Sequence, residues 1–144
     1  MKLYLAHPIV LRHEIRKIEL EIEANTGIEL INPFYDTERK DIEALDRGEK
    51  TIIEYGDALN PDTIVQGDLY LINSSAGTVA YLDRTVPMIG VVCEIWHTFA
   101  VCRKPVFIVS PNCLFHPWVK YIAKHSNGTC STDWLAFEAW VGNK

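Results

Sequence analysis

Short apolar segments alternate along the chain with longer segments in which apolar residues recur every three or four positions. Residues 2–5, 28–31, 78–82 and 105–109 are short and apolar, and they predict buried β-strands. A fifth short strand is expected just before Trp134, so the sheet is predicted to have four or five strands. The alternation of strands with helices indicates an α/β domain with a parallel sheet and helices on both faces.

The helices are predicted from apolar spacing and from capping residues. Residues 11–25 carry one apolar stripe that Gly27 ends, and residues 36–62 are acidic and helical in character. Asn60, Pro61 and Asp62 form a typical helix start, and that helix is expected to run to about residue 74. Residues 90–101 are apolar almost all round, which predicts a buried helix, and two further helices are expected over 117–125 and 134–141. The predicted buried positions in the second helical segment are Ile42, Leu45, Ile52 and Ile53.

This pattern predicts one domain over residues 1–144, with its site beyond the carboxyl ends of the strands. Tyr4, Asp36 and the loops 83–90 and 111–116 would gather at that edge. The glycine-rich motifs of dinucleotide-cofactor enzymes and of ATPases are absent from the sequence. A dinucleotide-cofactor or ATPase function therefore loses its main support.

Composition narrows the function further. The 144 residues are 48% hydrophobic and carry a net charge of −5, without a basic stripe. An acidic chain of this kind is a poor candidate for binding a nucleic-acid polymer, although a small nucleotide needs only one or two donors. No apolar stretch is long enough to span a membrane, and the four cysteines have no Cys-x-x-Cys spacing. We therefore expect a reduced, cytoplasmic protein without a zinc site.

Two carboxylates stand in unusually apolar surroundings. Asp68 falls between Ile64 and Ile72 on one face of its predicted helix. Glu94 lies in the first turns of the next helix, among valines, Cys93 and Ile95, where the helix dipole favours an ionised side chain. Burying an unpaired charge is costly, so such residues have a specific partner or a chemical function. The alternatives are that Asp68 lies at the water boundary and that Glu94 satisfies backbone donors.

A pair of carboxylates of this kind is typical of enzymes that cleave glycosidic bonds. One carboxylate attacks the anomeric carbon, and the other orients it or moves protons. Tyr4, at the end of the first strand, could direct its hydroxyl toward the nucleophile.

The segment Lys2-Leu-Tyr-Leu-Ala-His-Pro, Asp68 on a helix, and the later segment Gly90-Val-Val-Cys-Glu-Ile together resemble nucleoside 2-deoxyribosyltransferases and the related 2'-deoxynucleoside 5'-phosphate N-hydrolases. The resemblance implies a flavodoxin-like (Rossmann-like) fold and a retaining mechanism. Glu94 would be the nucleophile that takes the sugar C1', Asp68 would position it and aid proton transfer to the base, and Tyr4 would hydrogen-bond the glutamate. The resemblance also implies no metal or organic cofactor, and a homo-oligomer in which Phe115 and His116 of one subunit complete the site of another.

The first loop and the segment before Glu94 depart from the family pattern. The transferases typically carry an acid, and the monophosphate hydrolases a serine, at the position that Met88 occupies six residues before Glu94. The hydrolases' glycine-rich first loop is replaced here by a loop containing His7 and Arg12, either of which could hold a phosphate. Whether the substrate is phosphorylated, and whether its sugar is deoxyribose or ribose, stays open at this point.

The leading hypothesis is cleavage of the N-glycosidic bond of a nucleoside or nucleoside 5'-monophosphate, with transfer to another base or to water. A non-catalytic nucleotide-binding module and an NAD-type glycohydrolase are the alternatives. Phe34, Tyr35 and Trp118 could stack on a base, or pack in the core. Cys93 is expected to be a buried small hydrophobe, and the Glu94–His97 pair lacks the further ligands that a metal needs.

Overall fold

A computed structural model of the chain describes residues 1–37, 40–48 and 60–143. Its five parallel strands lie in the order β2-β1-β3-β4-β5. They are β1 (Lys2–Ala6), β2 (Glu29–Ile31), β3 (Thr78–Tyr81), β4 (Val106–Val109) and β5 (Thr129–Ser131). The predicted parallel sheet is therefore confirmed, and it has the larger of the two expected strand counts. This strand order is that of flavodoxin-like folds, in which the chain changes direction across the sheet between β1 and β3.

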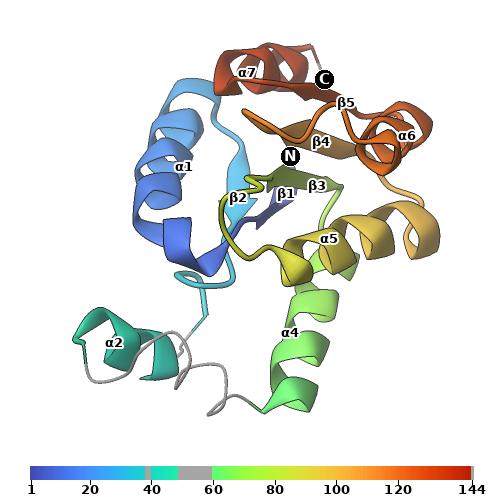
Figure 1. The fold of residues 1–144 in the computed structure, drawn as a ribbon. Helices are drawn as coiled ribbons and strands as arrows, with labels where there is room; N and C mark the ends of the chain where they lie inside the picture. The colour runs from blue at the N-terminus through green and yellow to red at the C-terminus, as the bar shows by residue number, and fades with distance from the viewer. Residues whose placement is uncertain (38–39, 49–59, 144) are drawn as a thin grey trace.

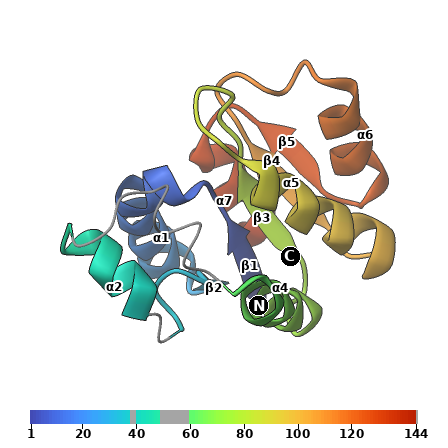
Figure 2. The same cartoon turned by 60° about the horizontal axis from the view of Figure 1, so that its bottom comes forward.

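Helices cover both faces of this sheet (Figure 1). One face carries α1 (Arg12–Thr26) and α7 (Trp134–Gly142), and the other carries α4 (Pro61–Asn73), α5 (Ile89–Trp96) and α6 (Pro117–His125). A 3-10 turn, Ile9–Leu11, precedes α1, and a π-helical turn, His97–Val101, follows α5. Figure 2 shows the short helix α2 (Lys40–Asp46) beside the start of α1, away from the sheet. Ile42 and Leu45 of α2 are buried as predicted, whereas Ile52 and Ile53 lie outside the described residues.

Alternation along the strands divides the core into two clusters. In β1, Leu3 and Leu5 face α1 and α7, whereas Tyr4 and Ala6 face α4, α5 and α6. Strands that are apolar on both faces must be covered on both sides, and this requirement makes the three-layer arrangement stable. Tyr4 is therefore fixed on the face that α4 and α5 cover.

The predicted helix boundaries are largely correct. Gly27 ends α1 in the left-handed conformation, with φ of 74°, which glycine adopts without steric cost. The Asn60 side chain accepts hydrogen bonds from the backbone N–H groups of Asp62 and Thr63, so it caps α4 as its sequence predicts. None of the helices in the described ranges combines the length and apolar character that a membrane crossing needs.

The prediction of a fully buried helix over residues 90–101 is wrong. Val91 and Ile95 are buried, but Ile89 is 81% exposed and Val92 and Trp96 are also exposed. The apolar residues therefore lie on two faces of α5. One face packs on the sheet, and the other is exposed and lines a cavity next to α6. Cys93 is exposed as well, which corrects the expectation of a buried thiol.

Candidate active site

A pocket of about 310 Å³ opens beyond the carboxyl ends of β1 and β3, between α4 and α5. This is the switch point of the sheet, where ligands bind in open α/β folds. Five structural segments meet there: the loops after β1, β2 and β3, the middle of α4 and the first turns of α5. Its described lining residues are His7, Pro8, Ile9, Phe34, Ile64, Asp68, Pro87, Met88, Ile89, Gly90, Val91 and Glu94. Asp68, Glu94, His7, Met88 and Gly90, which the sequence analysis singled out, therefore share one pocket.

Glu94 extends from the second turn of α5 into this pocket. The residue as a whole is partly exposed, but its carboxyl oxygen Oε2 is enclosed, with no close hydrogen-bond donor among the described residues. Its other oxygen, Oε1, faces Gly90, since a Cβ added at Gly90 would lie 3.7 Å from it. That spacing is an ordinary contact, so the carboxyl group lies directly against the start of its own helix.

Burial raises the pKa of the Glu94 carboxyl from its ordinary value of 4.5 to about 8. The Tyr4 hydroxyl approaches the carboxyl group as a potential donor and lowers the pKa, and the negative charge of Asp68 raises it further. The sequence favoured an ionised Glu94 because of the helix dipole. Burial and Asp68 outweigh that dipole, so in the free protein Glu94 is mostly protonated at neutral pH. A raised carboxyl pKa in a pocket is typical of groups that exchange a proton during catalysis.

Asp68 reaches the pocket from the middle of α4. Ile72, one turn later, is fully buried, and Ile64, one turn earlier, lines the pocket. Asp68 itself is partly exposed and lines the pocket, so this side chain is not buried in the core with Ile72. Its electrostatic effect on Glu94 places the two carboxyl groups within interaction range across the gap between α4 and α5.

Tyr4 lies in the core next to the carboxyl group of Glu94. The residue is fully buried in β1 and packs in the same core cluster as Ile72 and Ile95. Because the side chains of a strand alternate, the position of Tyr4 in β1 fixes its ring on the α4–α5 face. From this face of the sheet its hydroxyl can reach the Glu94 carboxyl group.

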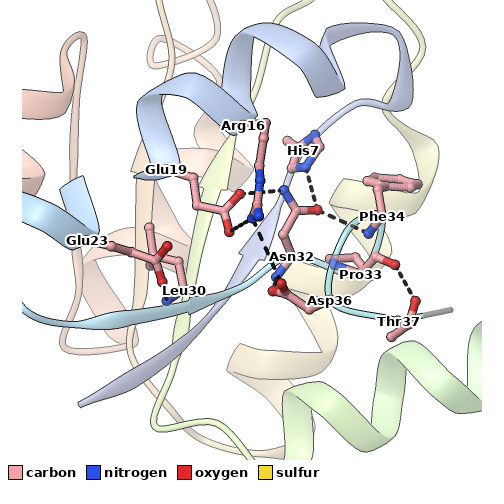
Figure 3. Close-up of polar contacts among 10 residues, drawn as sticks. All are labelled: His7, Arg16, Glu19, Glu23, Leu30, Asn32, Pro33, Phe34, Asp36 and Thr37. Carbon is pink, nitrogen blue, oxygen red and sulfur yellow. Dashed lines mark hydrogen bonds and ion pairs between the residues drawn. The ribbon is translucent and has the colours of Figure 1, made fainter. Parts of the chain in front are cut away.

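His7 follows β1 and belongs to a buried polar chain that the sequence analysis did not identify (Figure 3). Its Nε2 lies 3.1 Å from Oδ1 of Asn32, the residue that follows β2. Asn32 Nδ2 donates to Glu19 Oε2 at 2.8 Å, and Arg16 donates to Glu19 Oε1 at 2.8 Å. Asn32 is fully buried and Glu19 is 1% exposed. A signal was present: Glu19 falls between Ile15 and Ile22 on the apolar stripe of α1, the same pattern that singled out Asp68.

Arg12 and Asp36 lie outside the pocket lining. Arg12 donates from Nε and Nη2 to Asp46 Oδ1 and from Nη1 to the carbonyl oxygen of Ile9, so most of its donors are used in joining α1 to α2. Asp36 Oδ2 accepts the backbone N–H of Asn32 at 2.6 Å, and its Oδ1 lies 3.9 Å from Arg16. Both residues hold the segments that flank the pocket.

Phe115 and His116 line a second, larger cavity of about 380 Å³ between α5 and α6. Met88 lines both cavities. The His116 side chain accepts the backbone N–H of Trp118 and caps α6, while Phe115 and Trp118 are 63% and 61% exposed. Trp96 of α5 contacts Trp118 edge-on, with ring centroids 5.5 Å apart. In the single chain, therefore, Phe115 and His116 lie beside the Glu94 pocket and not in it.

His97 begins the π-helical turn after α5 and is absent from the lining of the candidate pocket. Its Nε2 is 3.0 Å from Oδ1 of Asn73, so this ring joins that turn to the end of α4. In the described ranges, acidic, histidine and cysteine side chains do not come together in groups that could hold a metal ion.

No protein-family model and no curated protein sequence matches the chain. Solved structures do match its fold over nearly the full length. A CMP N-glycosidase from Clostridium botulinum, BcmB, superposes with a TM-score of 0.61 at 15% identity, covering 100% of both chains. A 2-deoxyribosyltransferase from Bacillus psychrosaccharolyticus gives 0.62 at 17% identity, covering 98% of this chain and 96% of its own. A conserved protein from Enterococcus faecalis V583 gives 0.68 at 18% identity, covering 99% and 98%. The flavodoxin-like fold implied by the sequence resemblance is therefore confirmed.

Proposed function

We propose that this protein cleaves the N-glycosidic bond of a nucleoside or nucleotide by a retaining mechanism, with Glu94 as the nucleophile. The observation that carries the proposal is the meeting of Asp68 and Glu94 in one pocket, with Tyr4 on the glutamate. Two neighbours in fold, described as a CMP N-glycosidase and a 2-deoxyribosyltransferase, support the same class of chemistry.

The raised pKa of Glu94 suggests how protons are managed. Near neutral pH, Glu94 holds a proton beside the negative charge of Asp68. In the proposed reaction this proton passes through Asp68 to the departing base as the carboxylate of Glu94 attacks C1' and the C1'–N bond breaks, its electron pair going to the base. Water or a second base then attacks C1', and the bond from C1' to Glu94 breaks with its electron pair staying on the carboxylate. Asp68 takes the proton that the attacking group loses and returns it to Glu94. Tyr4 stabilises the ionised form of Glu94 by hydrogen bonding, which is the form that must attack.

The experiment that tests this function is incubation with a panel of nucleosides and their 5'-monophosphates, with and without a free acceptor base. Base release indicates hydrolysis, and base exchange indicates transfer, since both follow the same intermediate. Mass spectrometry of protein quenched during turnover should show a sugar adduct on Glu94 that is absent from Glu94→Gln. A panel without release, exchange or adduct would overturn the enzymatic function.

We further propose that the protein works as a homo-oligomer with shared sites. The aromatic surface around the second cavity is exposed in the single chain, and it includes Phe115, Trp118 and Tyr121. Mixing two variants tests the sharing: Glu94→Gln and Phe115→Ala, each impaired alone, should regain activity when unfolded and refolded together. Light scattering of the wild-type protein gives the subunit number, and an active monomer would exclude shared sites.

A nucleotide-binding module is the second candidate, because a protonated Glu94 is a poor nucleophile in the free protein. That function predicts nucleotide binding by calorimetry that survives Glu94→Ala, with no turnover in the wild-type protein. Nicotinamide release from NAD would instead indicate a glycohydrolase of dinucleotides.

A further inference from the structure

The polar chain Glu19–Asn32–His7 ends in the wall of the candidate pocket (Figure 3). It joins α1, the loop after β2 and the loop after β1, and all three residues are buried. Buried polar groups are costly unless each is satisfied, so the direction of each hydrogen bond in the chain can be assigned.

The orientation of the Asn32 amide is fixed from two sides. The backbone N–H of Phe34 can only donate, and it lies 3.1 Å from Asn32 Oδ1. Glu19 Oε2 accepts from Asn32 Nδ2 at 2.8 Å. A flipped amide would place its NH₂ group against the Phe34 N–H and its oxygen against the Glu19 carboxylate. Both contacts would be repulsive, so Oδ1 faces His7.

The tautomer of His7 follows from this orientation. Its Nε2 lies 3.1 Å from Asn32 Oδ1 and must carry the hydrogen. Burial lowers the pKa of His7, so near neutral pH the ring holds a single proton, on Nε2. Nδ1 is then left with a lone pair, and it lies 3.2 Å from the carbonyl oxygen of Pro8. The Pro8 oxygen accepts the backbone N–H of Leu11 at 3.1 Å with one lone pair, so its second lone pair and His7 Nδ1 are two acceptors without a hydrogen between them, in two residues that both line the pocket of Asp68 and Glu94.

We infer that His7 Nδ1 and the Pro8 carbonyl oxygen together accept a hydrogen bond from one hydroxyl group of the substrate's sugar, with Asn32 and Glu19 as positioning residues that fix the histidine tautomer. A single donor shared between the two acceptors relieves their repulsion, so binding a hydroxyl is favoured over binding a group that lacks a hydrogen. A phosphate dianion has no donor to offer and would be repelled at this point. This inference rests on the proposed function, and it adds that the pocket recognises a hydroxyl group of the sugar.

A substrate–variant cycle tests the contact. The substrate turned over fastest is compared with its 2'-, 3'- and 5'-deoxy analogues, on wild type and on His7→Phe, which keeps an aromatic ring against Phe34. In wild type, we expect one analogue to lose about tenfold in kcat/KM, the value of one hydrogen bond to an otherwise unpaired acceptor. In His7→Phe, the parent substrate should lose about the same factor, and that analogue should lose nothing more. A merely structural histidine would lower kcat/KM for all substrates alike and leave their ratio unchanged, which would overturn the inference.

Glu19→Gln is the matched positioning variant. Its side-chain oxygen can still accept from Asn32 Nδ2, so the ratio between the parent substrate and the deoxy analogue should stay as in wild type. Glu19→Leu removes the acceptor, and the ratio should fall toward one. Equal ratios in wild type and in Glu19→Leu would show that Glu19 does not position the histidine.

Nitrogen NMR of the histidine rings tests the inference without turnover. The wild-type spectrum should show His7 protonated on Nε2 and bare on Nδ1, and only a nucleoside with the required hydroxyl should shift the Nδ1 resonance. A proton on Nδ1, or the same shift with the deoxy analogue, would overturn the inference even where the enzyme is active. If the substrate panel shows no turnover but the Nδ1 shift depends on the hydroxyl, the proposed catalytic function fails and the hydroxyl contact stands as part of a binding site.

Discussion

Two buried carboxyl groups differ in how their oxygens are satisfied: Glu94 lines the candidate pocket, and Glu19 is joined to the pocket residue His7 through Asn32. Both Glu19 oxygens accept hydrogen bonds, from Arg16 and from Asn32. Oε2 of Glu94 has no close donor among the described residues, and its neighbour Asp68 carries the same charge. Burial raises the pKa of both side chains. At Glu19 the rise is opposed by Asn32 and Arg16 and increased slightly by Asp36, and at Glu94 it is opposed by Tyr4 alone and increased by Asp68.

The difference separates a carboxylate that holds the structure from one that is available to react. A satisfied carboxylate stabilises the segments that it joins, and removing it leaves buried donors without partners. An unsatisfied carboxylate costs stability in its charged form, and a fold keeps such a group where the charge is used. The same apolar surroundings therefore lead to opposite predictions for the two residues.

The largest expected effect is on activity at Glu94. Glu94→Gln has nearly the same shape but could not act as the nucleophile of the proposed reaction, so kcat should fall by about 10⁴-fold or more while the protein stays folded. The loss of activity is measured as kcat on the best substrate, and the folded state is checked by circular dichroism. Glu19→Gln is the control, and it should retain most of the activity. Loss of the folded signal in Glu94→Gln would mean that Glu94 is structural, like Glu19.

The pH dependence of stability should carry the signature of Glu94. Its pKa is about 8 in the folded protein against 4.5 ordinarily, so between these values the folded state binds a proton that the unfolded state has released. Stability should therefore fall as the pH rises through this window, by no more than about 5 kcal/mol for a shift of this size.

Urea unfolding below, within and above that window measures the effect. Glu94→Gln has no proton to lose at this position, so its stability should fall less with rising pH than that of wild type. Identical pH profiles for the two proteins would contradict the raised pKa. The same pKa predicts that kcat/KM falls as the pH rises through about 8, since the proposed reaction uses the proton that Glu94 holds in the free protein.

A stability effect of intermediate size is expected at Glu19. Glu19→Leu leaves Asn32 Nδ2 buried without its acceptor and should lower the free energy of unfolding by about 3 kcal/mol. Chemical denaturation measures this loss. Glu21, which is exposed on the same helix, provides the matched control, and Glu21→Leu should change stability by less than about 0.5 kcal/mol. Equal effects of the two substitutions would remove the distinction between a satisfied and an unsatisfied carboxylate.

The smallest effect is expected where α1 meets α2. Asp46→Asn weakens the contact of Asp46 with Arg12, whose Nη2 lies 2.7 Å from Oδ1. Asp46 is partly exposed, so Asp46→Asn should lower the free energy of unfolding by about 1 kcal/mol. This decrease should be the same whether Glu94 is charged or neutral. Denaturation of Asp46→Asn in both wild-type and Glu94→Gln backgrounds measures the effect and its independence. Strong coupling between the two positions would show that the α2 segment and the pocket act as one unit.

The sequence by itself determined the order of elements and the identity of the unusual carboxylates. The short apolar segments, the helical apolar spacing, the cap at Asn60 and the stop at Gly27 are local features. Local features survive into the structure because each is satisfied within its own segment. Asp68 and Glu94 were recognisable because each interrupts an apolar stripe. Glu19 interrupts its stripe in the same way, so the pattern finds buried carboxylates without telling reactive ones from structural ones.

Only the tertiary structure decided the partners. Asn32, from the loop after β2, donates a hydrogen bond to Glu19 and makes it a structural residue. Asp46 accepts hydrogen bonds from the guanidinium of Arg12, which the sequence analysis had considered as a ligand for phosphate. The charge state of Glu94 depends on burial against β1 and on the approach of α4, and neither is encoded in the residues around it. Hydrogen-bond partners and desolvation come from segments that meet only on folding, so they decide what each carboxylate can do.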